Sequence, residues 1–221
     1  MTSTALFRLS GLSVLLGAAL SILSSIVSAF FYGDPTKFAH NPVYIAAQAL
    51  NAIAGLFLVL GIPGVFARQA QGFGVIGLVG LVLLVVAALC FPVFFGLTGA
   101  VVFTWLADQA PKLVSSNSFP PGFFALFLVG GLSFVIACIL WAIQLIRRRV
   151  EPRWAGFVLV LAAVVQVATF PLPMATNVFI SLIQALSGIL ISVGIGALGY
   201  YTWTMTREEG RVARAAGTLA T

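Results

Sequence analysis

The chain has 221 residues, of which 61% are hydrophobic and only 7% are charged. Soluble domains are about 45–50% apolar and about 25% charged, so this composition excludes a soluble globular protein. The net charge is +6, but the basic residues flank apolar stretches and form no run with interleaved aromatic residues, so we expect lipid headgroups as partners and no nucleic acid.

Long charge-free stretches dominate the chain, and a membrane-spanning helix needs about 20 apolar residues. The last stretch, residues 154–206, is long enough for two helices and is interrupted by Pro171, Pro173 and Asn177. The sequence therefore predicts an all-α, polytopic membrane protein: a bundle of six transmembrane helices in a single domain, residues 1–221. The expected spans are residues 9–32, 43–67, 73–92, 122–146, 154–170 and 175–205.

The segment after the third span is unusual because residues 93–106 are apolar although that span is already long enough. A straight helix over residues 73–106 would be about 50 Å long, well beyond a hydrocarbon core of about 30 Å. We expect Pro92 to kink the helix. Residues 93–121 then form an outer interfacial segment and loop, whose apolar part either projects outward or lies along the outer interface, with Trp105 at the level of the headgroups.

The orientation follows from the basic residues between the spans. With the N-terminus inside, all nine arginines lie on the inner side, and only Lys37 and Lys112 lie outside. This positive-inside bias predicts that both termini are cytoplasmic.

An internal repeat is suggested by a shift of 79 positions, which brings Arg68 onto Arg147 and Phe91–Pro92 onto Phe170–Pro171. The hairpin of the second and third helices would then match the hairpin of the fourth and fifth. Because both hairpins point the same way, this predicts a parallel repeat.

Residues that could carry chemistry are scarce. No Asp, Glu, Lys or Arg lies inside an expected span, which argues against an ion- or proton-coupled carrier. The single histidine, His40, could share an ion with Asp34, but two ligands make a poor metal site, and a proline-flanked turn is the simpler interpretation. We expect no catalytic residues, no metal and no cofactor.

Polar residues inside the spans are the main candidates for a site. The first helix carries a stripe of small residues from Ser10 to Ser28 that suits close packing, with hydroxyls able to bond across helices. A second group falls in the middle or outer half of the other spans. Its members, the candidate polar cluster, are Gln48, Asn51, Gln166, Thr169, Asn177, Ser181 and Gln184.

Amides cannot face lipid without cost, so these side chains must meet one another, water or a ligand. As interhelical bonds, they fit a non-enzymatic protein that acts as an accessory or structural partner of other membrane subunits. As the lining of an outward-facing vestibule, they fit a transporter or binding protein for a small molecule or lipid. We expect Gln48 and Asn51 to lie within reach of Gln166 and Gln184.

Several segments resemble a recurrent pattern in small, uncharacterised bacterial integral membrane proteins. They are Arg8–Gly11, Gly61–Ala70, Gly72–Gly77 and Pro152–Gly156, followed by a glycine-rich, aromatic last span. The resemblance implies six helices and a location in the bacterial cytoplasmic (inner) membrane. It implies no activity.

Overall fold

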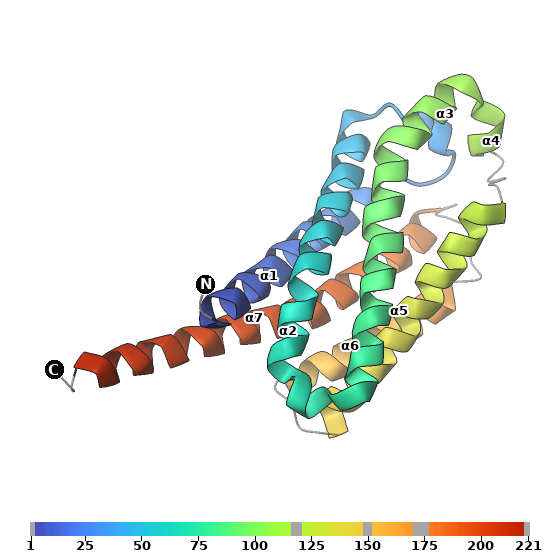
Figure 1. Ribbon diagram of the computed structural model, residues 1–221. Helices are drawn as coiled ribbons and strands as arrows, with labels where there is room; N and C mark the ends of the chain where they lie inside the picture. The colour runs from blue at the N-terminus through green and yellow to red at the C-terminus, as the bar shows by residue number, and fades with distance from the viewer. Residues whose placement is uncertain (1–2, 116–120, 148–151, 170–176, 219–221) are drawn as a thin grey trace.

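The computed structural model describes residues 3–115, 121–147, 152–169 and 177–218 of the chain. The described residues are helical apart from short turns and contain no strand. The main helices are α1 (Ser3–Ser28), α2 (Pro42–Ala88), α5 (Pro121–Arg147), α6 (Arg153–Thr169) and α7 (Val178–Thr218). This all-helical bundle, whose helices stand side by side in Figure 1, confirms the expected fold class in its coarser form.

Helix α2 consists of two antiparallel rods, Pro42–Ala70 and a second rod that begins at Phe73. The turn between them depends on Gly74, whose φ of 57° lies in the left-handed region that glycine adopts without strain. The rods pack closely: a Cβ on Gly96 would lie 2.7 Å from the backbone nitrogen of Ala52. Pro63 lies within the first rod without ending it.

The second rod does not end at Pro92, which differs from the expected third span of residues 73–92. It continues through the π-helical segments η2 (Leu89–Phe95) and η3 (Thr98–Val102) into α3 (Phe103–Gln109). Proline lacks the N–H for an α-helical bond, and the wider π turns accommodate this loss without breaking the rod. Residues 93–109 therefore extend the helix.

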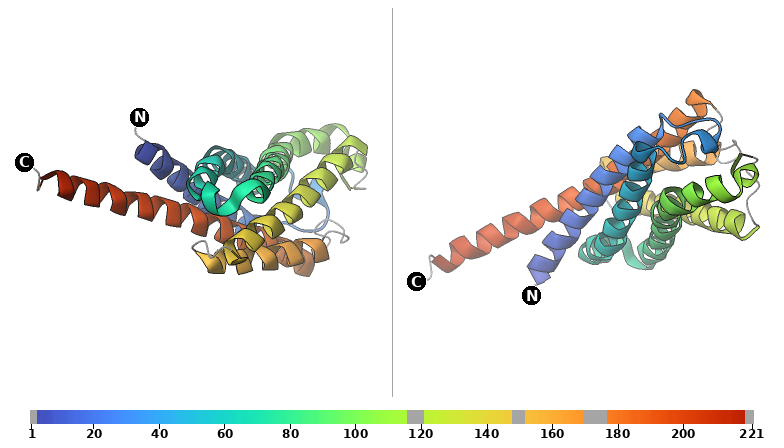
Figure 2. Two further views of the ribbon diagram at one scale, coloured as in Figure 1. Left: turned by 60° about the horizontal axis from the view of Figure 1, so that its bottom comes forward. Right: turned by 90° about the horizontal axis from the view of Figure 1, so that it is seen from above.

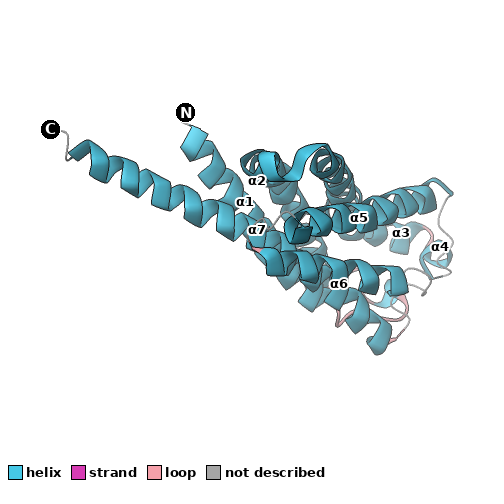
Figure 3. Cartoon of the chain, turned by 90° about the horizontal axis from the view of Figure 1, so that it is seen from below, coloured by secondary structure: helices cyan, strands magenta, loops and turns pink. Residues whose placement is uncertain are grey.

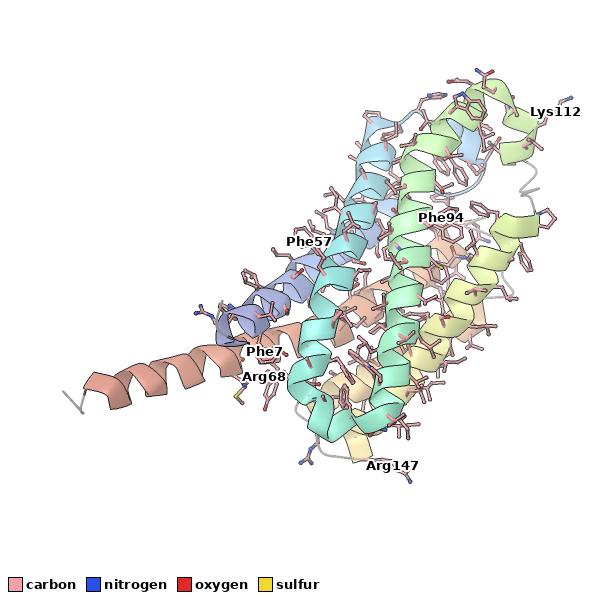
Figure 4. All side chains as sticks on the ribbon, viewed as in Figure 1. Phe7, Phe57, Arg68, Phe94, Lys112 and Arg147 are labelled. Atoms are coloured by element: carbon pink, nitrogen blue, oxygen red, sulfur yellow. The ribbon has the colours of Figure 1, made fainter. Side chains whose placement is uncertain are left out.

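Two short elements cover the end of the bundle to which α3 leads. A 3₁₀ turn, η1 (Pro35–Lys37), precedes α2, and α4 (Pro111–Ser115) follows α3 and contacts η1. Figure 4 shows Lys112 at this end and Arg68 and Arg147 at the other. We call them the lysine end and the arginine end.

The rods form a closed ring. α1 packs on α2 and α7, α2 packs on α5, α5 on α6, and α6 on α7. The views in Figures 2 and 3 show the same arrangement, with the C-terminal part of α7 extending beyond the other helices.

The outer surface of the ring is apolar on every side. Leu60 is 73% exposed, Val75 78% and Phe157 62%, and these residues come from three different rods. Exposed tryptophans lie toward both ends, Trp105 in α3 and Trp154 at the start of α6, as in the aromatic belts of membrane proteins. Among the described residues, five helices are long and apolar enough to cross a membrane, and α6, with 17 residues, is shorter. The chain is thus a multi-pass membrane protein.

Serine hydroxyls bond backbone carbonyls of neighbouring helices, which confirms the role expected for the stripe on the first helix. Ser13 Oγ donates to Phe57 O at 2.7 Å and Ser24 Oγ to Ala47 O at 2.9 Å. Small residues also let α1 and α7 touch: a Cβ on Gly11 would lie 2.7 Å from Gly199 O. These contacts fix α1 between α2 and α7.

The expected hairpin repeat lies partly outside the described residues, because these exclude Phe170, Pro171 and the turn at 148–151. The repeat stays a prediction.

Candidate functional site

The rods described above all contribute to a half-open cavity of about 250 Å³ inside the ring. α1 provides Ser21 and Ser25, and α6 provides Gln166. The two rods of α2 and its continuation, together with α5 and α7, provide the remaining lining residues. These are Asn51, Leu58, Ile62, Leu84, Ala87, Ala88, Phe91, Pro92, Phe95, Phe134, Gln184, Gly188, Ile191, Ser192 and Ile195.

Three members of the candidate polar cluster, Asn51, Gln166 and Gln184, meet at this cavity. They do not pair with one another as we expected. Gln166 Oε1 accepts a hydrogen bond from Ser187 Oγ at 2.9 Å, which fixes its amide. In the part of the chain that the structure describes, the amides of Asn51 and Gln184 have no hydrogen-bond partner. Two polar groups therefore stay available to whatever occupies the cavity.

The other four members lie elsewhere. Gln48 packs on the second rod, where a Cβ on Gly99 would lie 3.0 Å from its Oε1. Thr169 Oγ1 donates to Gln166 O at 3.0 Å, one turn back in its own helix. Asn177 Oδ1 accepts from Ile180 N at 3.0 Å and so caps α7, and Ser181 Oγ donates to Ala29 O at 3.0 Å. Thus Thr169, Asn177 and Ser181 form hydrogen bonds within or between helices, whereas Gln48 has no hydrogen-bond partner among the described residues.

At the lysine end, Asp34 and His40 were considered as two ligands of one ion. Each of them instead has a protein partner of its own. Asp34 Oδ1 accepts from Thr36 N at 3.0 Å and from Thr36 Oγ1 at 2.8 Å, and these bonds hold the pKa of its carboxyl below the ordinary value. His40 Nε2 instead pairs with Asp108 Oδ1 at 3.0 Å. The two side chains thus have separate partners, and the described residues contain no group of three metal-ligating side chains.

Further contacts tie the loop before α2 to the end of the long rod. Thr104 Oγ1 donates to Ala39 O at 3.1 Å, and Phe31, Phe38 and Tyr44 pack ring against ring with centroids 4.9–5.6 Å apart. The loop at the lysine end is therefore a packed cap.

Two features of the polar interior were missed by the sequence analysis. Ser21 belongs to the stripe assigned to packing and Ser25 was not singled out, yet both line the cavity. Gln69 is 9% exposed, and neither its Oε1 nor its Nε2 has a hydrogen-bond partner. Gln69 follows Arg68 near the turn, and no sequence signal marks it as buried.

Searches of protein families, curated proteins and solved structures find no match to this chain. The resemblance to small bacterial membrane proteins therefore stays a prediction, and an assignment of function depends on the geometry alone.

Proposed function

We propose that this protein is a non-enzymatic, six-span membrane protein that binds a small uncharged molecule in the centre of its helical ring. The observation that carries the proposal is the cavity, because it is lined from every rod and includes the unpartnered amides of Asn51 and Gln184. These two amides face one cavity, so a polar group of a ligand could satisfy both, whereas an unsatisfied amide in a membrane costs several kcal/mol.

Six spans require that α6 cross the bilayer. Its 17 residues rise about 26 Å, slightly less than a hydrocarbon core of about 30 Å, and spans of about 17 residues lie at the lower limit. α6 packs on both α5 and α7, so it closes the ring between two longer apolar helices. Both termini then lie on the cytoplasmic side, together with Arg68 and Arg147, in the cytoplasmic membrane of a bacterium.

Thermal unfolding in the presence of 1-octanol tests the binding function. A ligand that binds only the folded state raises its stability, by about 2.7 kcal/mol at one hundred times the dissociation constant. We expect 1-octanol to raise the melting temperature of the purified protein.

The variant Ala88→Phe fills the cavity and should abolish this increase. The control Ala168→Phe places the same ring on the exposed face of α6, so this variant should retain the increase in melting temperature. An equal response of all three proteins would show that 1-octanol acts on the micelle, and the binding function would be rejected.

A second candidate function, an accessory subunit of a membrane assembly, is favoured by one separate feature. The C-terminal part of α7 extends beyond all other helices of the ring. In native gel electrophoresis of membranes solubilised under mild conditions, an accessory subunit migrates in a larger complex, and truncation after Met205 should release it. Migration of both forms as the free chain would exclude this role.

A further inference from the structure

The helix register gives the cavity one polar end and one apolar end. In α2, Asn51 precedes Ile62 by eleven residues, and in α7 Gln184 precedes Ile195 by the same number. At 1.5 Å per residue, each pair is separated by about 16 Å along its helix. Both rods run from the lysine end toward the arginine end, so both amides lie nearer the lysine end.

Contacts between helices place Ser21, Ser25 and Gln166 at the same end. Ser192, the other polar residue of the lining, lies nearer Ile195, and its hydroxyl donates to Gly188 O of its own helix. Ser24 bonds Ala47 O, which puts the neighbouring Ser21 and Ser25 near the level of Asn51. Gly188 approaches α1 so closely that a Cβ there would lie 2.7 Å from Ser25 Oγ. Gln166 joins this group through its bond from Ser187.

The apolar end is fixed in the same way. The second rod runs antiparallel to the first, so Leu84 lies about 16 Å nearer the arginine end than Phe95. In α5, Gly130 lies against Cys90, and Trp141 Nε1 donates to Gly77 O at 3.1 Å. Phe134 lies between these two contacts and therefore at the level of Leu84, beside Ile62.

The chemistry of the lining sets the class of ligand. The lining contains no Asp, Glu, Lys, Arg or His, so a charged group would be buried there without a counter-ion. The amides of Asn51 and Gln184 can each donate and accept, and Gln166 Nε2 remains a donor because Ser187 occupies its Oε1. These groups suit a hydroxyl, which also donates and accepts.

The volume of the cavity indicates the size of the ligand. A cavity of ~150 Å³ holds benzene, so on that scale 250 Å³ accommodates about ten non-hydrogen atoms. A whole phospholipid is far too large for this half-open cavity.

We propose that the cavity selects an uncharged, single-chain amphiphile of about ten non-hydrogen atoms. Its hydroxyl lies among Asn51, Gln166 and Gln184, and its chain extends toward Phe134 and Leu84. This inference rests on the proposed function and adds to it the class of ligand and its orientation.

Photolabelling tests the orientation in vesicles of phosphatidylcholine and phosphatidylglycerol that contain the full chain. The probes are two photoreactive octanols, one with the diazirine beside the hydroxyl and one with it near the chain end. We expect the first to label peptides around Asn51 and residues 184–188, and the second to label residues 84–91 and Phe134. Identical labelling of both ends by both probes would overturn the orientation.

Competition tests the class of ligand. We expect 1-octanol to displace the probes, octane to displace them less well, and octanoate and octylammonium to leave them bound. A long-chain monoacylglycerol shares the headgroup chemistry but exceeds the volume of the half-open cavity, so it should compete less well than 1-octanol. Competition as strong as that of 1-octanol, by either ion or by the monoacylglycerol, would overturn the proposal.

Variants test the polar end. Asn51→Leu and Gln184→Leu should each weaken displacement by 1-octanol about 3- to 30-fold, the range for one interhelical hydrogen bond in lipid, and leave displacement by octane unchanged. Gln48→Leu is the matched control, because this amide lies outside the cavity and should not affect either competitor. If a leucine variant does not fold, the methionine variant of the same residue replaces it.

The outcomes separate the two proposals. Saturable labelling with equal displacement by octane and 1-octanol would retain binding in the cavity but reject an amphiphilic ligand. Labelling that is not saturable at any lining residue would reject both.

Discussion

At Gly11 the backbones of α1 and α7 lie in direct contact, and this residue gives a sharp test of the packing. A Cβ there would lie 2.7 Å from Gly199 O and 2.8 Å from Trp203 N, and neither backbone atom can move alone. We expect Gly11→Ala to destabilise the fold by about 1–3 kcal/mol, the usual cost of overpacking, measured by thermal unfolding in detergent.

The control for Gly11→Ala is Gly122→Ala in α5. A Cβ on Gly122 meets no atom within 4 Å, so this variant should be as stable as the wild type or slightly more stable, because alanine favours helix. An unchanged melting temperature for Gly11→Ala would contradict the contact between α1 and α7.

Trp141 provides a second test at the residue scale. Its indole Nε1 donates to Gly77 O at 3.1 Å, its side chain is 1% exposed, and its ring lies 5.4 Å from that of Phe73. Trp141→Phe removes the hydrogen bond and leaves a small void, so we expect a loss of about 1–2 kcal/mol. Trp105→Phe, at a residue 61% exposed, should leave the unfolding free energy unchanged. Equal melting temperatures of the two variants would contradict the hydrogen bond of Trp141 to Gly77 O, which joins α5 to α2.

At the scale of elements, the contribution of the cap at the lysine end to the stability of the fold depends on pH. The bonds from the backbone N–H and the hydroxyl of Thr36 lower the pKa of Asp34 below its ordinary value of 3.8. A carboxyl whose pKa is lowered by folding stabilises the fold above the ordinary pKa, and the contribution is lost as the pH falls through the lowered value.

This behaviour can be measured by NMR in micelles. We expect the amide proton of Thr36 to titrate with a midpoint below 3.8 and to lose this titration in Asp34→Asn. A midpoint at or above the ordinary value would contradict the cap.

Sequence patterns predicted the elements far better than their junctions. The charge-free stretches located each rod, because a membrane helix must be apolar over its whole length. The continuation past Pro92 was not predictable, because the local rule says that proline ends or kinks a helix. The π turns and the packing of Gly55 and Gly96 on the neighbouring rod depend on tertiary structure.

The candidate site was predictable only in part. Asn51, Gln166 and Gln184 stood out because amides are rare and costly in a span. That the amides of Asn51 and Gln184 stay unpaired, with Ser187 bonding Gln166, depends on the register between helices, which the sequence does not specify. The pair of His40 with Asp108 joins the loop before α2 to the distant helix α3 and also depends on the fold.

At the scale of the whole molecule, α6 closes the ring of helices. α6 packs between α5 and α7, so the cavity has a wall on that side only because this 17-residue helix stands with the longer ones. A protein with five spans would leave α6 on one surface of the membrane and expose Gln166 to solvent or headgroups.

The number of spans decides on which side each terminus lies, so a pair of topology reporters is the most direct test of the account. One reporter is fused before Met1 and the other after Thr221, each in an otherwise intact chain. Six spans predict that both reporters lie on the cytoplasmic side, and a reporter inserted near Ser116 should lie outside. Termini on opposite sides of the membrane would contradict the closed six-helix ring and the cavity within it.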